Sequence, residues 1–324
     1  MNRPSLLLAS IAVPLGAGAQ TARRHIVLAV LREPAVTDEI SMPRTAIAAL
    51  RELGWVDGQN ARVELASAGA RVVDLPELAR DVIGRKPDVI MAQGGTVTAA
   101  LVAATREVPI VMSTSAFDPV ERGWAESYSR PGRNVTGITF IADEAVDKQL
   151  ELLKEAAPSM RHVGLLRTRE NAATRSILER ARSSAARLNL RTSVADVDGE
   201  SGVEPAIEQL RRAGADALLP IVDPVMDGLR ARIAELAIRH RLPSAAQIAY
   251  YASAGILITY AADLNELHRR CAAYVDRILR GTPRGELPIE RPTKFGFTLN
   301  LRTARAIGLS VPSSLLARAD EVIE

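Results

Sequence analysis

The sequence is poor in cysteine and in aromatic residues. Its one cysteine, Cys271, cannot form a disulfide within the 324-residue chain. Aromatic residues make up 3% of the sequence and hydrophobic residues 47%, so any core must be built mainly from aliphatic side chains. A chain of this length is large enough for two α/β lobes whose cores are stable without disulfides.

The positive charge is modest and dispersed. The formal net charge is +3 and the pI is about 9.2, and most basic residues are arginine. These arginines are interspersed with acidic residues instead of forming a basic run. A nucleic-acid partner is therefore not expected, and we interpret the charges as a solvated surface.

Motifs for common catalytic and cofactor chemistry are missing. The four histidines are isolated, with no other histidine or cysteine at metal-ligand spacing. The sequence contains no G-x-S-x-G or Walker A motif, and Gly94-Gly95-Thr96 resembles a phosphate-binding turn only loosely. Ser113, Thr114 and Ser115 follow a buried strand, but no histidine in a comparable turn could act as their base. We therefore expect no enzyme activity, no metal site and no cofactor.

The first residues have the pattern of a secretory signal peptide. Arg3 precedes an apolar run from Leu6 to Leu15, and Ala17-Gly18-Ala19 provides a small-residue cleavage site. The run is too short for a membrane span. We predict that residues 1–19 are a signal peptide for export to the periplasm, with a disordered apolar tail as the alternative. No cysteine follows the run, so a lipoprotein is not predicted.

Buried strands and amphipathic helices alternate in the first part of the chain. Short apolar runs bounded by turns and helices are typical of parallel strands covered on both faces. Strands are predicted at 25–31, 61–66, 88–92, 109–113 and 135–140, and helices at 43–53, 75–84 and after Gly94-Gly95-Thr96. This alternation predicts a right-handed, doubly wound α/β sheet.

The rest of the chain repeats this plan and then returns. Helices are predicted at 144–157, 174–188, 203–213 and 225–240, and strands at 163–166, 191–197 and 217–222. A strand at 255–260, a helix at 264–279 for the first lobe, a strand at 294–301, a helix at 301–307 and a short terminal amphipathic helix follow. We predict two Rossmann-like lobes joined by several strands: residues 25–142 with 261–293, and 143–260 with 294–324.

Polar turns follow the predicted strands, where ligands bind in parallel sheets. Gly95 allows close backbone approach, and Thr96 could cap a helix whose free N–H groups attract a carboxylate or phosphate. Asp118-Pro119-Val120 recurs as Asp223-Pro224-Val225, and each aspartate could cap the following segment or contact a ligand. Tyr250-Tyr251 could stack on a ligand or pack in the core.

Segments spread over nearly the whole chain carry a family resemblance. They are LRELGWVDGQN (50–60), SRPGRNVTGIT (129–139), KQLELLKEAAP (148–158), RIAELAIRHRLP (232–243), and 274–309, which includes LPIERPTKF and NLRTARAIGL. These segments closely resemble ABC-transporter substrate-binding proteins of the tryptophan/tyrosine-uptake type. The resemblance implies a type I periplasmic-binding-protein fold, with two Rossmann-like lobes, a three-stranded hinge and a ligand enclosed in the cleft.

The resemblance also implies that the turns after the strands line the cleft. The ligand-binding residues predicted from it and from the turns are Gln93, Gly95, Thr96, Ser113, Thr114, Asp118, Asn171, Asp223, Tyr250 and Tyr251. The implied function is that of a monomeric periplasmic solute-binding protein for an inner-membrane ABC permease with its ATPase. Its ligand would be a small polar molecule, such as an amino acid or a related organic anion. The alternative is a ligand-sensing domain for a regulatory or signalling partner.

Overall fold

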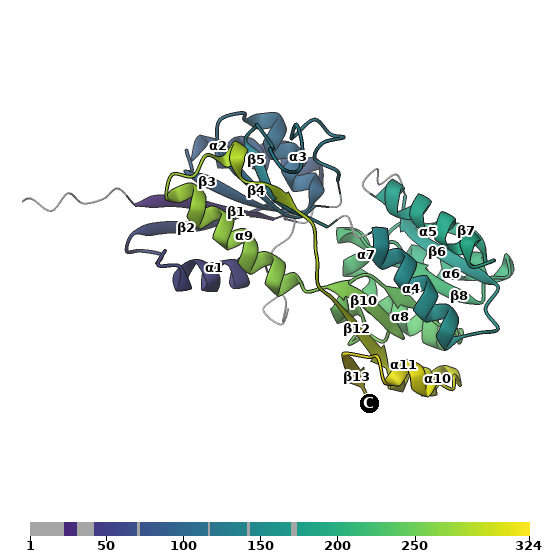
Figure 1. Ribbon diagram of the computed structural model, residues 1–324. Coiled ribbons are helices and arrows are strands. Elements are labelled where there is room, and N and C mark those ends of the chain that lie inside the picture. The colour runs from purple at the N-terminus through teal and green to yellow at the C-terminus, as the bar shows by residue number, and fades with distance from the viewer. Residues whose placement is uncertain (1–22, 31–41, 70–71, 116, 141–142, 170–173) are drawn as a thin grey trace, which may run out of the picture.

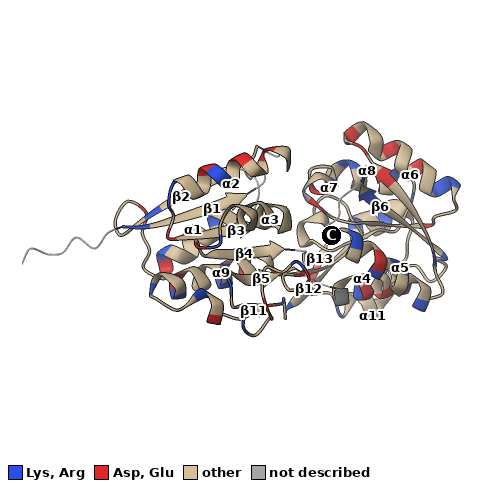
Figure 2. Ribbon diagram, turned by 90° about the horizontal axis from the view of Figure 1, so that it is seen from above, with Lys and Arg blue, Asp and Glu red and all other residues tan. Residues whose placement is uncertain are grey.

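The computed structural model describes residues 23–30, 42–69, 72–115, 117–140, 143–169 and 174–324. These residues form two α/β lobes (Figure 1). Basic and acidic side chains are interspersed over both lobes (Figure 2). Within the described part of the chain, every helix is too short or too polar to cross a membrane.

The first lobe is built on a six-stranded sheet in which every pair is parallel, with the order β11-β5-β4-β3-β1-β2. Its strands are β1 (Arg24–Val30), β2 (Ala61–Ser67), β3 (Val89–Gln93), β4 (Ile110–Ser115), β5 (Val135–Thr139) and β11 (Ile289–Glu290). Its helices are α1 (Met42–Glu52), η1 (Val72–Asp74), α2 (Leu75–Gly84), α3 (Gly95–Ala104), α9 (Leu264–Leu279) and η5 (Arg284–Glu286).

Helices cover both faces of this sheet, which explains its continuous apolar strands. Along β1, Ile26 and Leu28 pack in the cluster that contains α1 and α9, whereas Val27 and Ala29 pack in the cluster that contains α2 and α3. Alternate side chains of a strand point to opposite faces, so a strand covered on both sides must be apolar at every position.

The second lobe repeats the strand order of the first and has one more strand, β13, at its edge. A bridge between Leu218 and Ser244 joins the sheet β7-β6-β8 to the sheet β9-β10-β12-β13. The strands are β6 (His162–Thr168), β7 (Arg191–Val197), β8 (Ala217–Pro220), β9 (Ala245–Ala246), β10 (Ile258–Ala262), β12 (Phe295–Asn300) and β13 (Glu321–Ile323). The helices are α4 (Asp143–Ala156), α5 (Arg175–Arg187), η3 (Glu200–Gly202), α6 (Val203–Arg212), α7 (Pro224–Gly228), α8 (Arg230–Arg239), η4 (Ala249–Tyr251), α10 (Leu301–Ile307) and α11 (Ser313–Leu316). Helices α4 and α5 pack in one core cluster and α6 and α8 in another.

The chain passes between the lobes three times: from β5 to α4, from β10 to α9, and from β11 to β12. Hydrogen bonds join the segments next to these crossings to earlier elements of each lobe. The Thr136 hydroxyl donates to the Leu287 carbonyl at 2.7 Å, and the Gln149 amide donates to the Tyr260 carbonyl at 2.9 Å. The predicted fold class, two doubly wound lobes with a multi-strand hinge, is confirmed.

Three predicted elements differ from the structure. The helix expected at 225–240 is divided into α7 and α8, where Gly228 interrupts a helical pattern that glycine disfavours. The strand expected from Gly255 begins later, at Ile258, because Gly255 has a φ of +113°. The prediction of a terminal amphipathic helix was wrong beyond Leu316, because residues 321–323 form β13, which pairs with β12. The Asp320 carboxylate also accepts from Phe297 N at 2.8 Å.

Candidate ligand-binding site

The carboxyl ends of β3 and β4 bring two of the predicted turns together. Gln93 and Ser113 are partners in the parallel pairing, and the Gly94 N–H donates to the Ser113 carbonyl at 2.8 Å. Helix α3 starts from this edge and lies on the side of the first lobe that faces the second (Figures 1 and 2). The first two turns therefore form one surface.

The amino terminus of α3 has a glycine at its N-cap position and therefore no capping side chain from that residue. Gly94 is the N-cap residue, with φ 83° and ψ 159°, and no described side chain caps the helix. The prediction of Thr96 as the cap was wrong, since Thr96 lies inside the first turn. Thr98 instead donates its hydroxyl to the Gly94 carbonyl at 2.8 Å. The first-turn N–H groups and the helix dipole therefore favour an anion at this position.

An aromatic side chain that was not among the predicted ligand-binding residues lies against the amino terminus of α3. A Cβ on Gly95 would be 2.5 Å from Cδ2 of Phe117, so the ring of Phe117 occupies the space beside the start of α3. Trp124 packs edge-on against this ring at 5.9 Å between centroids, and the Arg122 guanidinium lies 4.1 Å from its centroid. The available signal was an aromatic residue two positions after Ser115, at the end of β4, in a chain with few aromatics.

The hydroxyl groups at the end of β4 have different environments. Ser113 is fully buried, and its side chain is next to Cys271 on α9. Burial raises the pKa of the Cys271 thiol to about 12. The thiol donates to the Met112 carbonyl at 3.6 Å, and the Ser113 hydroxyl has no hydrogen-bond partner among the described residues. Thr114 is half-buried and has a φ of +57° where the β4–β5 register shifts. Residues with such a strained backbone cluster at functional sites, so Thr114 is the better candidate for a ligand contact of the two.

Asp118 organises the segment after β4. One carboxylate oxygen accepts from Val120 N at 2.8 Å and from Glu121 N at 3.1 Å. The other oxygen accepts from the Tyr128 hydroxyl at 3.0 Å, and that hydroxyl accepts from Arg291 at 3.4 Å. Burial raises the pKa of Tyr128, and Arg291 opposes this rise. Asp118 thus links the turn to the β11–β12 crossing.

Asp223 makes the matching turn in the second lobe. It is 7% exposed and caps α7, with one oxygen accepting from Val225 N at 2.9 Å and from Met226 N at 2.8 Å. The same oxygen accepts from the Thr168 hydroxyl at 3.0 Å, which connects the ends of β6 and β8. The predicted contact Asn171 lies outside the described residues.

The two predicted tyrosines have different positions. Tyr251 is fully buried in the second lobe, and its hydroxyl has no hydrogen-bond partner among the described residues. Burial raises its pKa well above the usual value for tyrosine. Tyr250 is half-buried, and the Arg230 guanidinium lies 5.3 Å from its ring centroid. Only Tyr250 therefore has side-chain surface that a ligand could contact without rearrangement.

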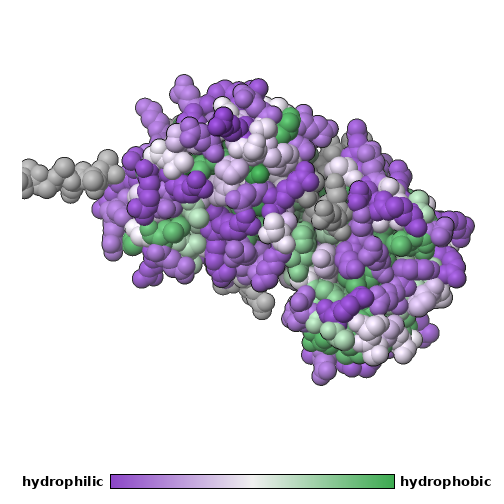
Figure 3. All heavy atoms as spheres, in the orientation of Figure 1, coloured by the Kyte–Doolittle hydropathy of each residue, from purple (hydrophilic) through white to green (hydrophobic). Residues whose placement is uncertain are grey.

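The two lobes offer complementary groups. The first provides helix N–H donors, the Thr114 hydroxyl and the Phe117 ring, and the second provides the Asp223 carboxylate and Tyr250. Helix α7 lies on the side of the second lobe that faces the first (Figures 1 and 2), and the molecular outline narrows between the lobes (Figure 3). Among the described residues, no cluster of three or more His, Cys, Asp or Glu could hold a metal ion.

Comparisons with known proteins agree with this architecture. The family model described as ABC transporter substrate binding protein matches residues 27–323. A tyrosine-binding protein from Clostridioides difficile (strain R20291) is 24% identical over 263 residues, which cover 81% of this chain and 75% of that protein.

Solved structures show the same fold. A conserved domain protein from Vibrio cholerae O1 biovar El Tor is 24% identical, with a TM-score of 0.85 over 93% of this chain and 99% of that one. The ABC domain in complex with L-Trp from Streptococcus pneumoniae is 16% identical, with a TM-score of 0.81 over 93% of this chain and 100% of that one.

Proposed function

The chain belongs to the ABC transporter substrate-binding protein family, and we propose that it is the extracytoplasmic solute-binding component of an ABC importer. Its ligand would be an amino acid or a related organic anion, bound between the lobes. The partner would be an inner-membrane permease with its ATPase, and the protein would act as a monomer.

The observation that carries this proposal is the open amino terminus of α3. The uncapped first turn has N–H donors and positive dipole character, and a Cβ on the N-cap residue Gly94 would meet nothing within 4 Å, so the backbone there is open to a ligand. A ligand carboxylate would bind there. An enzyme would need a nucleophile or base at this position, and the side chains next to it, Thr96 and Phe117, offer neither a base nor an activated nucleophile.

The second lobe supports a zwitterionic ligand. Asp223 is the N-cap residue of α7, and its carboxylate would attract an ammonium group, while Tyr250 adds an aromatic surface. An amino acid has both charges at the required ends. The tyrosine-binding relative and the L-Trp complex make aromatic amino acids the first ligands to test.

We assign the predicted site residues to two roles. The proposed contacts are Gln93, Gly95, Thr96, Thr114, Asn171, Asp223 and Tyr250, together with Thr168. The proposed supporting residues are Ser113, Asp118 and Tyr251, which are buried or bonded within their own lobe. A ligand held by both lobes would stabilise the closed arrangement, because it gains contacts there that the open one lacks.

The proposal includes export. Residues 1–19 would direct the chain across the inner membrane and be removed. Residues 25–142 with 261–293 would form one lobe, and residues 143–260 with 294–324 the other. Amino-terminal sequencing of protein recovered from the periplasm should begin at Gln20. Recovery of the uncleaved chain from the cytoplasm would contradict this part of the proposal.

Ligand binding can be tested with the mature protein. A thermal-shift screen of the twenty amino acids and common organic anions should reveal a stabilising ligand, whose affinity is then measured by calorimetry. Gly95→Ala should weaken binding at least tenfold, because its Cβ would displace the Phe117 ring. Gly84→Ala is the matched control, since a Cβ there meets nothing within 4 Å. Equal affinity in the two variants would place the site elsewhere, and no stabilisation by any compound would contradict the proposed ligand class.

A further inference from the structure

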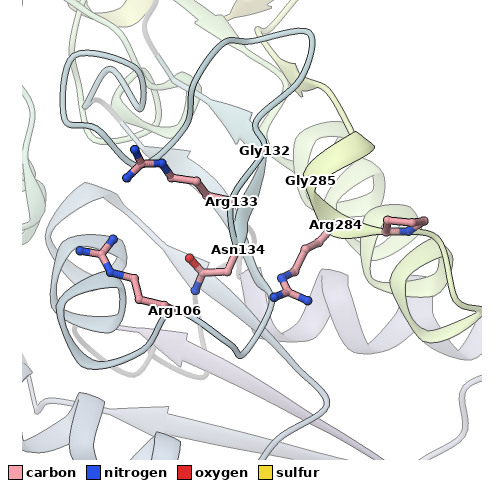
Figure 4. Close-up of a pocket in the computed structure, with 7 residues that line it drawn as sticks. Arg106, Gly132, Arg133, Asn134, Arg284 and Gly285 are labelled. Atoms are coloured by element: carbon pink, nitrogen blue, oxygen red, sulfur yellow. The ribbon is translucent and has the colours of Figure 1, made fainter.

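A hollow of about 490 Å³ lies at the amino-terminal end of the first sheet, opposite the candidate ligand-binding turns. It is formed where the chain enters β4 and β5 and where it leaves α9 (Figure 4). The lining residues are Arg106, Gly132, Arg133, Asn134, Pro283, Arg284 and Gly285. We call this hollow the arginine groove.

Two glycines lie close together in the lining of the arginine groove. The Gly132 N–H donates to the Gly285 carbonyl at 3.0 Å, which joins two loops that are distant in the sequence. A Cβ on Gly285 would be 3.2 Å from the Gly132 backbone, and Gly132 has a φ of +68°. This close approach needs glycine and places Arg133 and Arg284 on the two joined loops.

The third arginine is on a loop that is also fixed. Asn134 is buried, and its side-chain amide donates to the carbonyls of Thr105 at 3.2 Å and Val108 at 3.0 Å. These bonds hold the connection between α3 and β4, which carries Arg106. The three guanidinium groups therefore project from backbone that is tied together by hydrogen bonds (Figure 4).

The charge of the groove is not neutralised within the described part of the chain. Arg106, Arg133 and Arg284 make no ion pair there; Arg133 donates one N–H to the Gly123 carbonyl at 2.8 Å. The Nε of Arg284 is buried and has no hydrogen-bond partner among the described residues. Glu126 lies against Gly132 at the rim, but no acidic side chain lines the groove.

We propose that the arginine groove binds a phosphate-type oxyanion of two or more negative charges, independently of the ligand between the lobes. Guanidinium groups bind tetrahedral oxyanions through paired N–H donors, and three arginines line this hollow, Arg284 on one side and Arg106 and Arg133 on the other (Figure 4). The buried, unpartnered Nε of Arg284 is the donor that an anion would satisfy. The phosphate could belong to a soluble molecule or to a lipid headgroup.

Calorimetric titration of the mature protein with inorganic phosphate tests the proposal, with chloride at equal ionic strength as the reference. We expect saturable binding of one phosphate per chain. Arg284→Gln and Arg106→Gln should each weaken it at least tenfold. Arg80→Gln is the matched control, because it removes the same charge from an exposed position on α2 and should leave phosphate affinity unchanged.

The source of the phosphate is tested with vesicles. Co-sedimentation with phosphatidylglycerol vesicles that is lost in Arg284→Gln would identify a lipid headgroup, and phosphate binding without co-sedimentation would identify a soluble phosphate. The proposal is overturned if phosphate binding is absent, or if Arg80→Gln and Arg284→Gln weaken it equally. Circular dichroism and the melting temperature confirm that each variant is folded.

Discussion

Asp223 allows the structural and binding roles of one carboxylate to be separated. In Asp223→Ala, the cap of α7 is lost, which costs about 0.5–2 kcal/mol. The Thr168 hydroxyl also loses its acceptor, which costs about 0.5–1.5 kcal/mol more. Because Asp223 is only 7% exposed, water cannot fully replace these bonds. We expect the free energy of unfolding of the second lobe to fall by roughly 1–3 kcal/mol.

The variant Asp223→Asn separates the loss of charge from the loss of the helix cap. Asparagine caps helices as well as aspartate does, and its carbonyl oxygen can keep the three bonds that one Asp223 oxygen accepts. Only the negative charge is removed, which costs about 0.3–1 kcal/mol at a helix amino terminus. If Asp223 also attracts the ligand ammonium, Asp223→Asn should weaken ligand binding at least tenfold while most of the stability is kept.

Two assays measure these effects. Thermal unfolding should show a decrease of roughly 2–12 °C for Asp223→Ala and a smaller one for Asp223→Asn, since 1 kcal/mol shifts a unit of this size by roughly 2–4 °C. Calorimetry with the identified ligand gives the affinities. An unchanged melting temperature in Asp223→Ala would refute the capping argument. An unchanged affinity in Asp223→Asn would show that Asp223 has a structural role alone.

Three further predictions concern the core. Gly137→Ala should lower the free energy of unfolding by at least about 3 kcal/mol in a urea titration, because its Cβ would be 2.2 Å from the Met112 carbonyl oxygen and φ is +117°; an effect as small as that of Gly84→Ala would contradict this. Burial lowers the pKa of His268 from 6.5 to about 4, so its neutral form is favoured in the fold. The contribution of neutral His268 to the free energy of unfolding is complete above pH 6.5 and should fall by about 3 kcal/mol as the pH drops toward 4. Urea titrations at pH 5 and 7.5 should show a smaller loss of stability at pH 5 in His268→Leu than in the unmodified protein. The Cys271 thiol, with its pKa of about 12, should resist iodoacetamide at pH 8 in the folded protein and react only after unfolding.

The sheets of both lobes were predictable because their strands are covered on both faces. Continuous apolar runs such as those of β1 and β3 have no other common explanation when glycine turns and amphipathic helices separate them. Helix α9 was placed correctly in the first lobe, with the predicted bounds Leu264–Leu279. The element that failed, at the chain end, depends on pairing with β12, and such long-range pairing leaves no local pattern in three residues.

The candidate site was only partly predictable. The sequence locates the turns, because turns follow strands, but it does not show which way a strand-end side chain points. Ser113 and Thr114 are adjacent hydroxyl residues, yet a positive φ and a register shift at Thr114 give them different environments. Phe117 was not singled out as a ligand contact, because its position beside Gly95 depends on an approach between two separate turns. The arginine groove likewise joins loops that are more than one hundred residues apart, which charge counting along the chain cannot reveal.

The late return of α9 and β11 to the first lobe determines when that lobe can finish folding. The Cys271 thiol reaches the Met112 carbonyl across 159 positions of sequence, and the Thr136 hydroxyl reaches the Leu287 carbonyl across 151. Until α9 is made, the sheet face that contains Ile26 and Leu28 lacks half of its cover. A growing chain therefore cannot complete its first lobe until β11 is made, after most of the second lobe, and such distant contacts slow folding. Both halves reach their final form only near the end of synthesis, an order fixed by the path of the chain and not by the stability of either sheet.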